Sequence, residues 1–372
     1  MRVGFGALTM SAKEGVRQSG IHHYSAHLIA HLPAALEPDE LVVYSALPGS
    51  GAGHRSVAHY KPFIPLENPA VRTAWEQTRL PVRLRKDRID LYHGPAFVVP
   101  KLARVPSVAT IHDLAFLRWP DQTTRRRSRY LSKQVRQAVG QATRIIAVSE
   151  HTRREIAELL DVDPDRVDVT PLGVDPAFRP STDDEIEHFR TEKGLMPPFI
   201  LAVGNLEPRK NLDALVKAFD AIATEIPHDL VLAGAEGWKS GRLMEAIAAS
   251  PYRDRIRTPG FVPRQDLPLW YSSCDAFVIP SLDEGFGLTL LEALSCGAPA
   301  VVANRGALPE VAGHAALLTE PNDCALAAAL TQILESRELQ SSLRAQGPVR
   351  AARFTWQRTA ELTVRSYRKA MA

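Results

Sequence analysis

The chain has 372 residues, of which 45% are apolar and 23% charged, and its formal net charge is +3 at pH 7. This length exceeds one ordinary hydrophobic core and predicts two domains. No uncharged apolar run reaches the roughly 18 residues that span a bilayer, and residues 1–10 are too short and too glycine-rich for a signal sequence. We therefore expect a globular cytoplasmic protein.

Charge is distributed unevenly along the chain. Residues 1–180 carry 25 Lys and Arg against 18 Asp and Glu, whereas the remainder carries 20 against 24. The basic excess concentrates between Arg118 and Arg154, where ten basic residues accompany two acids. Such a segment favours anionic partners.

Three cysteines, Cys274, Cys296 and Cys324, lie in apolar surroundings. Their number is odd and no pair has C-x-x-C spacing, which argues against disulfides and against structural zinc. We expect all three to be thiols of the hydrophobic core.

Short apolar runs alternate with amphipathic stretches through the first half of the chain. The expected strands cover 2–8, 40–45, 89–93, 105–111 and 144–148, and the expected helices cover 22–32, 70–85 and 123–142. This alternation predicts a doubly wound parallel sheet. The loop after the first strand contains Ser19 and Gly20, and Gly20 can bring the backbone close to a phosphate.

The expected strand 105–111 ends in His112 and Asp113. Residues at the carboxyl end of a parallel strand line the ligand crevice of such sheets, so this pair is a candidate for substrate contact. The alternative is a structural role, with the histidine in a loop and the aspartate capping a helix.

The expected helix around Arg125 to Arg136 is strongly basic and allows two interpretations. It could attract the anionic surface of a membrane that carries a lipid-linked substrate. It could equally be a solvated helix in an arginine-rich protein, and this second interpretation is the one we favour.

Segment 172–180 is rich in proline and aspartate and reads as a linker. The same architecture then repeats, with expected strands at 199–204, 230–234, 275–280 and 299–303, and a helix from Leu212 towards Thr224. Domains over 1–178 and 179–354 follow, with a helical tail over 355–372.

Two adjacent cations, Arg209 and Lys210, lie between the strand 199–204 and the following helix. Positive side chains just outside a parallel strand and before a helix N-terminus form a clamp for anions. Arginine offers a planar fork to two phosphate oxygens, and lysine adds a compact charge.

A second glycine-rich turn follows the strand 275–280. Glu284 lies in this turn, the next helix is expected to begin near Gly287, and Glu292 lies about one turn into it. The backbone amides of Gly285, Phe286, Gly287 and Leu288 and the helix dipole suit a diphosphate. Each carboxylate can accept hydrogen bonds from a diol, so Glu292 would hold a ribose and Glu284 a second sugar. The ligand implied is a nucleoside diphosphate sugar.

The stretch from Glu284 to Glu292, an acid followed by Gly-Phe-Gly and a second Glu after seven intervening residues, resembles the E-x7-E motif of retaining family 4 glycosyltransferases with the GT-B fold. The resemblance implies two Rossmann-like domains that face each other across a cleft. The first would bind mainly the acceptor and the second mainly the donor, and the tail 355–372 would cross back onto the first domain.

The resemblance also implies roles for single residues. Arg209 and Lys210 would grip the donor diphosphate, while Glu284 would fix the sugar without forming a covalent adduct. His112 would orient the transferred sugar, and Asp113 would either steer His112 or face the acceptor. The loop at Gly20 would close over the diphosphate, and Val262 would approach the base through its backbone.

The activity so implied is retaining transfer of a hexose to a hydroxyl of a glycan or lipid-linked acceptor, without a metal or other cofactor. Overall likeness to bacterial mannosyltransferases favours GDP-mannose as the donor, ahead of a UDP-sugar. Nucleic acid is not an expected partner, and peripheral contact with the cytoplasmic face of a membrane remains an interpretation of the basic helix.

Two other functions stay open from the sequence. A nucleotide-sugar epimerase or phosphorylase of the same fold would act without an acceptor, and a noncatalytic subunit would bind the nucleotide sugar without turnover. A nicotinamide oxidoreductase is disfavoured, because Gly4 and Gly6 lie inside the first strand and no G-x-G-x-x-G follows it.

Overall fold

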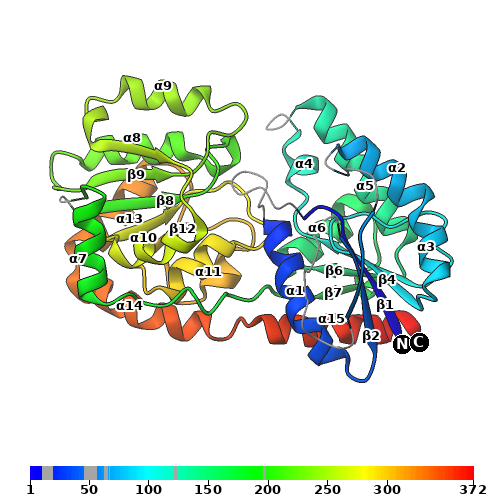
Figure 1. Ribbon diagram of the computed structural model, residues 1–372. Helices are drawn as coiled ribbons and strands as arrows, with labels where there is room; N and C mark the ends of the chain where they lie inside the picture. The colour runs from blue at the N-terminus through cyan, green and yellow to red at the C-terminus, as the bar shows by residue number, and fades with distance from the viewer. Residues whose placement is uncertain (11–19, 46–56, 63–65, 67, 121–123, 196–197) are drawn as a thin grey trace. The chain divides into compact units, whose positions relative to one another are not determined.

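The computed structural model describes residues 1–372 except 11–19, 46–56, 63–65, 67, 121–123 and 196–197. The chain divides into two compact units, Met1–Gly173 with Thr355–Ala372, and Val174–Phe354 (Figure 1). Each unit is a parallel sheet with flanking helices. The predicted α/β class with two parallel-sheet domains is therefore confirmed.

The first unit contains seven strands in its described residues, in the spatial order β3-β2-β1-β4-β5-β6-β7, and all neighbours are parallel. The strands are β1 (Arg2–Ala7), β2 (Glu40–Ser45), β3 (Val57–Tyr60), β4 (Leu91–Gly94), β5 (Ser107–Ile111), β6 (Arg144–Ala147) and β7 (Val167–Val169). The helices are α1 (Gly20–Leu36), α2 (Pro69–Thr78), α3 (Leu80–Lys86), α4 (Ala115–Arg118), α5 (Arg125–Gln141), α6 (Glu150–Leu160) and α15 (Trp356–Met371).

The second unit repeats this order with six strands in its described part, β10-β9-β8-β11-β12-β13, again all parallel. The strands are β8 (Phe199–Val203), β9 (Asp229–Ala233), β10 (Ile256–Gly260), β11 (Ala276–Ile279), β12 (Ala300–Ala303) and β13 (Leu317–Thr319). The helices are α7 (Asp183–Glu192), α8 (Leu212–Ile222), α9 (Gly241–Ala249), α10 (Leu267–Ser273), α11 (Leu288–Ser295), α12 (Leu308–Ala312), α13 (Asp323–Glu335) and α14 (Arg337–Ala351).

In both sheets the strand order reverses once, between β1 and β4 in the first unit and between β8 and β11 in the second. The chain leaves β1 and β8 towards one edge of the sheet and leaves β4 and β11 towards the other. A crevice opens at the carboxyl ends of the two strands at such a point, which is where parallel α/β sheets bind ligands. The topology thus marks the ends of β8 and β11 as a binding position.

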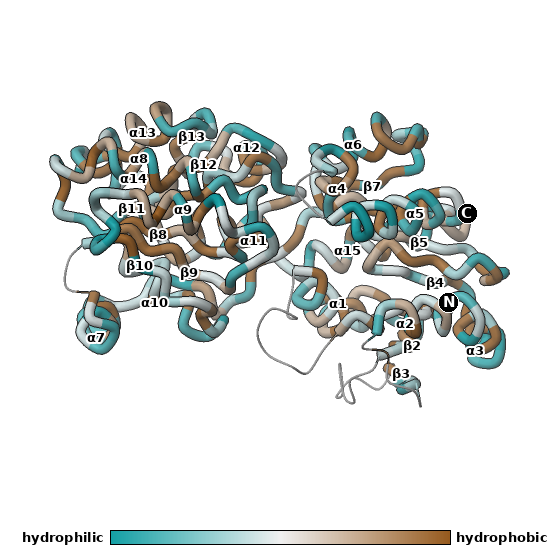
Figure 2. The backbone as a smooth tube through the Cα atoms, turned by 90° about the horizontal axis from the view of Figure 1, so that it is seen from above, coloured by the Kyte–Doolittle hydropathy of each residue, from teal (hydrophilic) through white to brown (hydrophobic). Residues whose placement is uncertain are grey.

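The inner strands are largely apolar because helices cover both faces of each sheet. The residues of β11 and β12 are all buried, and Figure 2 shows the hydrophobic colour running along β8 and β11. In the second unit a hydrophobic cluster joins these strands to α8 and α13, with Phe219 and Leu330 fully buried in it. This packing holds the carboxyl ends of the strands in fixed register.

The structure corrects two expectations from the sequence. The helix expected over 70–85 is divided at Arg79 into α2 and α3, because Pro81 in the first turn of α3 cannot donate a backbone hydrogen bond. Of the three cysteines, Cys274 and Cys296 are buried as expected, but Cys324 is exposed at the start of α13.

The C-terminal helix α15 packs in the first unit, against α1 and the strands β5 and β6. Trp356 in its first turn is buried and stacks on His27 of α1 at 4.6 Å between ring centroids. The chain passes very close to itself here: a Cβ added at Gly173 would lie 2.2 Å from the backbone nitrogen of Trp356. Only glycine fits at that crossing.

Candidate active site

The loop between β8 and α8 carries Arg209 and Lys210. A 3-10 turn over Pro208–Lys210 directs the loop towards the end of β11. Asn211 closes the loop in the left-handed conformation, with φ of 54°, and its side-chain amide donates a hydrogen bond to the carbonyl oxygen of Pro280 at 3.0 Å. The loop is therefore tied to the residue that directly follows β11.

Both cations contact the same carboxylate, that of Glu284. Arg209 Nη1 lies 2.9 Å from Oε2, and Lys210 Nζ lies 2.6 Å from Oε1. The Ser281 hydroxyl also donates to Oε1 at 2.8 Å, and Arg209 Nη1 donates in addition to the carbonyl oxygen of Asp283. We call Arg209, Lys210, Ser281 and Glu284 the Glu284 cluster.

The Glu284 cluster keeps its carboxylate ionised. Burial alone would raise the pKa of Glu284, but the charges of Arg209 and Lys210 outweigh burial and lower the pKa to about 2. The cluster thus combines two cations with one anion at neutral pH. The sequence analysis assigned sugar hydroxyls as the partners of Glu284; the structure shows cations in contact with it, which the sequence does not indicate.

Glu292 lies in the second turn of α11 and is 3% exposed. Its Oε1 accepts a hydrogen bond from Arg264 Nη1 at 2.6 Å, and the Tyr271 hydroxyl lies 3.5 Å from Oε2. Burial raises the pKa of Glu292, and the Arg264 charge opposes that rise. Sequence reasoning missed Arg264, since nothing in its local pattern links it to a helix 28 residues later.

The helix α11 begins as the sequence predicts, directly after Gly287. Gly287 has φ of 97° and offers no side-chain cap to the first amides of the helix, Leu288 among them. Such amides, together with the helix dipole, suit an anionic ligand. Phe286 is buried, with its ring 5.9 Å from that of Phe354, which fixes the turn before the helix.

A pocket opens where the topology places a binding position. Its lining comes from the end of β8, the loop that follows it, the first residue of α8, and the end of β11 with the two residues after it: Ala202, Val203, Gly204, Lys210, Leu212, Val278, Ile279, Pro280 and Ser281. Gly204 has φ of 146°, and a Cβ there would lie 3.3 Å from Cε of Lys210. Glycine at this position lets the lysine side chain lie along the strand end.

In the first unit, His112 follows β5 and is held by a backbone contact. Its Nε2 lies 2.8 Å from the carbonyl oxygen of Pro95, which can only accept, so Nε2 carries the proton. Burial lowers the pKa of His112, so the ring is neutral and Nδ1 is left as an acceptor. The ring of Tyr24 meets it edge-on at 4.8 Å. The side chain of Asp113 accepts a hydrogen bond from the backbone N–H of Ala115 at 3.3 Å, while the N-cap of α4 is Leu114.

Sequence comparison agrees with this arrangement in both units. Residues 18–178 match the family model described as Glycosyltransferase Family 4, and residues 183–350 match the model for Glycosyl transferases group 1. The chain is 31% identical over 368 residues to O-antigen chain mannosyltransferase B of Escherichia coli, which covers 94% of this chain and 96% of that protein. The chain belongs to the family 4 glycosyltransferases.

Other relatives place this glycosyltransferase in the same family. A D-inositol 3-phosphate glycosyltransferase of Frankia alni is 33% identical over 294 residues, covering 74% of this chain and 72% of that protein. Among solved structures, sucrose-phosphate synthase of Thermosynechococcus elongatus superposes with a TM-score of 0.79 at 19% identity, over 99% and 98% of the two chains. HepE of Anabaena, solved with UDP and glucose, gives 0.74 at 19% identity over 99% of each chain. The predicted GT-B fold is confirmed, and the chain is a hexosyltransferase.

The glycosyltransferase contains a buried polar network that the sequence analysis did not predict. His93 on β4 contacts the Tyr367 hydroxyl through Nδ1 at 2.6 Å and Thr110 Oγ1 through Nε2 at 2.8 Å. Tyr24, whose ring supports His112, contacts the same Thr110 oxygen at 2.9 Å. Burial lowers the pKa of His93 to about 3, so it stays neutral. The partners are up to 274 residues apart, and no local signal could have joined them.

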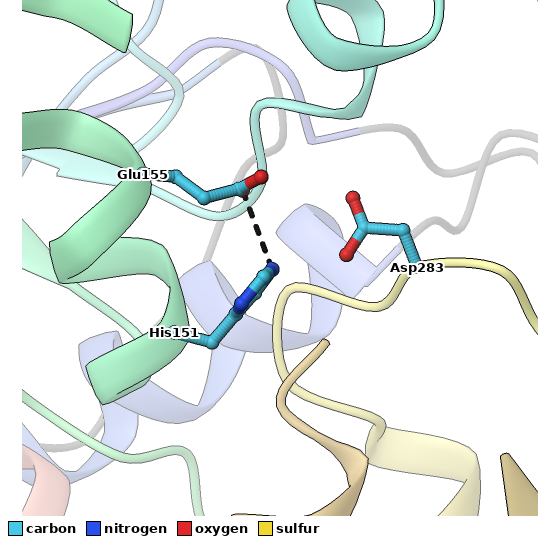
Figure 3. A group of neighbouring side chains, drawn as sticks. All are labelled: His151, Glu155 and Asp283. Carbon is cyan, nitrogen blue, oxygen red and sulfur yellow. Dashed lines mark ion pairs between the residues drawn. The ribbon is translucent and has the colours of Figure 1, made fainter. Parts of the chain in front are cut away.

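A second group that sequence reasoning missed lies at the start of α6. His151 Nε2 is 3.5 Å from Oε2 of Glu155 one turn later, and Figure 3 shows these two side chains pointing towards each other. Arg118 Nε, at the end of α4, lies 2.6 Å from Oε1 of Glu155. Ser149 caps α6, because its side chain accepts a hydrogen bond from the backbone N–H of Thr152.

The structure gives little information on two other predicted ligand contacts, Gly20 and Val262. Gly20 is the first residue of α1, and the loop before it, with Ser19, lies outside the described residues. Val262 is half-buried in the segment after β10. The roles assigned to both stay predictions.

The basic helix α5 packs its apolar side, including Val135 and Ala138, into the core of the first unit, while Arg125, Arg126 and Arg127 are exposed. Across the chain as described, no helix combines the length and apolarity needed to cross a bilayer. Membrane contact by α5 stays a prediction.

The turn that carries Glu284 depends on Gly306, and this gives a test. Gly306 has φ of 60°, and a Cβ there would lie 2.6 Å from both the backbone nitrogen and oxygen of Glu284. We expect Gly306→Ala to destabilise the chain by about 2 kcal/mol or more and to weaken nucleotide binding, because the turn must shift. Urea unfolding and calorimetric titration with nucleoside diphosphates measure the two effects.

Gly194 offers the matched control. It also has a left-handed φ, of 63°, but a Cβ there would meet nothing within 4 Å. Gly194→Ala should show only the conformational cost, of about 1 kcal/mol, with nucleotide affinity unchanged. Equal losses in the two variants would show that the clash with Glu284 has no effect.

Proposed function

We propose that this glycosyltransferase transfers mannose from GDP-mannose to a hydroxyl of a glycan or lipid-linked acceptor, with retention at the anomeric carbon. The observation that carries the proposal is the Glu284 cluster, which holds Arg209 and Lys210 beside the pocket at the ends of β8 and β11. The name of the Escherichia coli relative supports mannose as the sugar. A UDP-hexose is the second candidate, supported by the UDP and glucose bound to the Anabaena neighbour.

The negative charge that develops during the reaction explains why Arg209 and Lys210 suit it. As the glycosidic bond of the donor breaks, the sugar becomes oxocarbenium-like and negative charge accumulates on the departing diphosphate. Arg209, Lys210 and the amides at the start of α11 are preorganised to stabilise that charge. Because these cations and amides supply the stabilisation, we expect transfer without a metal ion.

Glu284 would hold the donor sugar in addition to pairing the cations. Its two oxygens accept three hydrogen bonds from protein groups, and a carboxylate offers about four acceptor positions. One position is therefore left for a sugar hydroxyl. The Glu284 carboxylate would thus fix the positions of the two cations and of the donor sugar.

The remaining contacts follow from the groups each residue offers. Glu292 would accept hydrogen bonds from the ribose hydroxyls, and the backbone near Val262 would approach the base. His112, with Nδ1 free to accept, would bind a hydroxyl of the transferred sugar. For the acceptor we assign mainly the first unit, with Asp113 as a further contact. The backbone at Gly20 would approach the donor diphosphate.

Assay of the purified protein with GDP-mannose, UDP-glucose and UDP-galactose tests the proposal. We expect transfer from GDP-mannose to a mannose-containing acceptor at a rate unchanged by EDTA, with an α-linked product by NMR. A β-linked product would exclude retention. Turnover of the nucleotide sugar with no acceptor present would instead indicate an epimerase or phosphorylase.

A further inference from the structure

Arg264 is held against Glu292 although nothing in the sequence joins them. It opens the turn Arg264–Asp266, a few residues after β10. Its Nη1 lies 2.6 Å from Oε1 of Glu292, and the two side chains are 29% and 3% exposed. The pair thus connects a partly solvated cation to a buried anion.

Aromatic residues fix the geometry of this pair on two sides. The guanidinium of Arg264 lies over the ring of Phe178, 4.6 Å from its centroid. The hydroxyl of Tyr271, a fully buried residue of α10, lies 3.5 Å from the other oxygen of Glu292. Arginine and carboxylate are therefore each limited to one arrangement.

Apart from Arg264, most influences on Glu292 work against its charge, although the hydrogen bond from Tyr271 favours the charged form. Burial is the largest influence and raises the pKa of Glu292, and the negative charge of Asp175 raises it further. Tyr271 on α10 and Cys296, directly after α11, are neutral neighbours, because burial raises the pKa of both. Arg264 supplies the positive charge that opposes these effects.

We propose that Arg264 is a positioning residue: it keeps the side chain of Glu292 ionised and oriented to accept hydrogen bonds from the ribose of the donor nucleotide. This rests on the proposed role of Glu292 as the ribose acceptor. A carboxylate accepts from both hydroxyls of a diol, whereas a protonated glutamic acid offers a donor in place of one acceptor. Without Arg264, Glu292 would change from the carboxylate to the protonated acid as the pH falls.

The test is the Arg264→Gln variant, with donor KM, kcat and nucleoside diphosphate affinity measured from pH 5.5 to 8.5. We expect donor KM to rise about tenfold at pH 6, which corresponds to a loss of about 1.4 kcal/mol of binding free energy. The defect should shrink as the pH rises and Glu292 regains its charge. At saturating donor, kcat should stay within twofold of the wild type, and Arg264→Lys should restore most of the affinity.

The stability of the variant should depend on pH in the opposite direction to its defect in donor binding. An unpaired buried carboxylate destabilises the fold most when it is ionised, so the melting temperature of Arg264→Gln should fall further below wild type as the pH rises. If instability caused the binding defect, the defect would grow with pH instead of shrinking. Arg257, whose partner Asp229 is 8% exposed, is the matched control. Arg257→Gln should lower stability without any pH-dependent change in donor KM.

Two outcomes overturn the inference. One is a donor KM in Arg264→Gln that equals the wild type. The other is a KM raised equally at every pH or more at high pH. The Glu292→Ala variant shows whether the inference about Arg264 or the proposed function of Glu292 is wrong. If Glu292→Ala binds nucleotide normally, the ribose role is wrong and the inference falls with it; if it loses binding while Arg264→Gln is unaffected, only the inference is wrong.

Discussion

Replacing Arg209 with alanine is expected to lower kcat by about 100- to 1,000-fold, the effect of removing one preorganised donor from a developing anion. The guanidinium is 20% exposed and directs two hydrogen bonds at the Glu284 turn, so its position is set before the donor arrives. Steady-state kinetics at saturating donor measure the loss. Donor KM should change less, because the diphosphate gains most of its charge only as the bond breaks.

Folding should survive this substitution. Glu284 retains Lys210 at 2.6 Å and Ser281 at 2.8 Å, so the buried carboxylate is not left without partners. Arg209→Lys should recover part of the rate, since it restores the charge without the planar fork. Arg242 is the control: its side chain is 82% exposed in an ion pair with Asp213, and Arg242→Ala should leave kcat and stability unchanged. A normal kcat in Arg209→Ala would show that Arg209 does not stabilise the departing diphosphate.

The second large effect concerns Glu284→Gln, which keeps the shape of the side chain and removes its charge. We expect transfer to fall about 1,000-fold or more, because this carboxylate both fixes the cations and binds the sugar. At the same time the affinity for the free nucleoside diphosphate should rise, since Arg209 and Lys210 would no longer be neutralised in part by Glu284. Kinetics and calorimetric titration measure the two changes, and their opposite directions distinguish this result from general damage to the site.

The stability of the same variant should depend on pH in a defined direction. The pKa of Glu284 is lowered from 4.5 to about 2, so the wild type gains stability from this group above pH 4.5 and loses it as the pH falls towards 2. The gain is on the order of 3 kcal/mol. The difference in unfolding free energy between wild type and Glu284→Gln should therefore be constant from pH 5 to 8 and shrink below pH 4.5. A difference that is constant down to pH 3 would contradict the strong pairing of Glu284.

Local sequence signals sufficed where a feature depends on a few consecutive residues. The start of α11 near Gly287 and the position of Arg209 and Lys210 in a strand-to-helix loop were both predicted. The division at Arg79 is not evident from the sequence, because proline is also tolerated in the first turn of a helix. The edge strand β3 has too little burial to produce a periodic pattern.

Partners across long distances could not be predicted in this way. Glu284 meets its cations 74 and 75 residues away, Glu292 meets Arg264 over 28 residues, and His93 meets Tyr367 over 274. Each pair forms because parallel strands bring their carboxyl ends to one edge of a sheet, or because α15 returns to the first unit. Sequence reasoning identified acids and cations separately and assigned hydroxyls of the ligand to the acids.

By itself the sequence determined the class of fold, the family and the chemical kind of each group around Glu284 and Glu292, since these depend on residue type and spacing along a strand, turn and helix. The tertiary structure alone decided which charges neutralise one another and which protonation state each group holds. The physical reason is that the pKa and orientation of a buried group depend on every charge and dipole nearby in space, and most of those neighbours are far away in the chain.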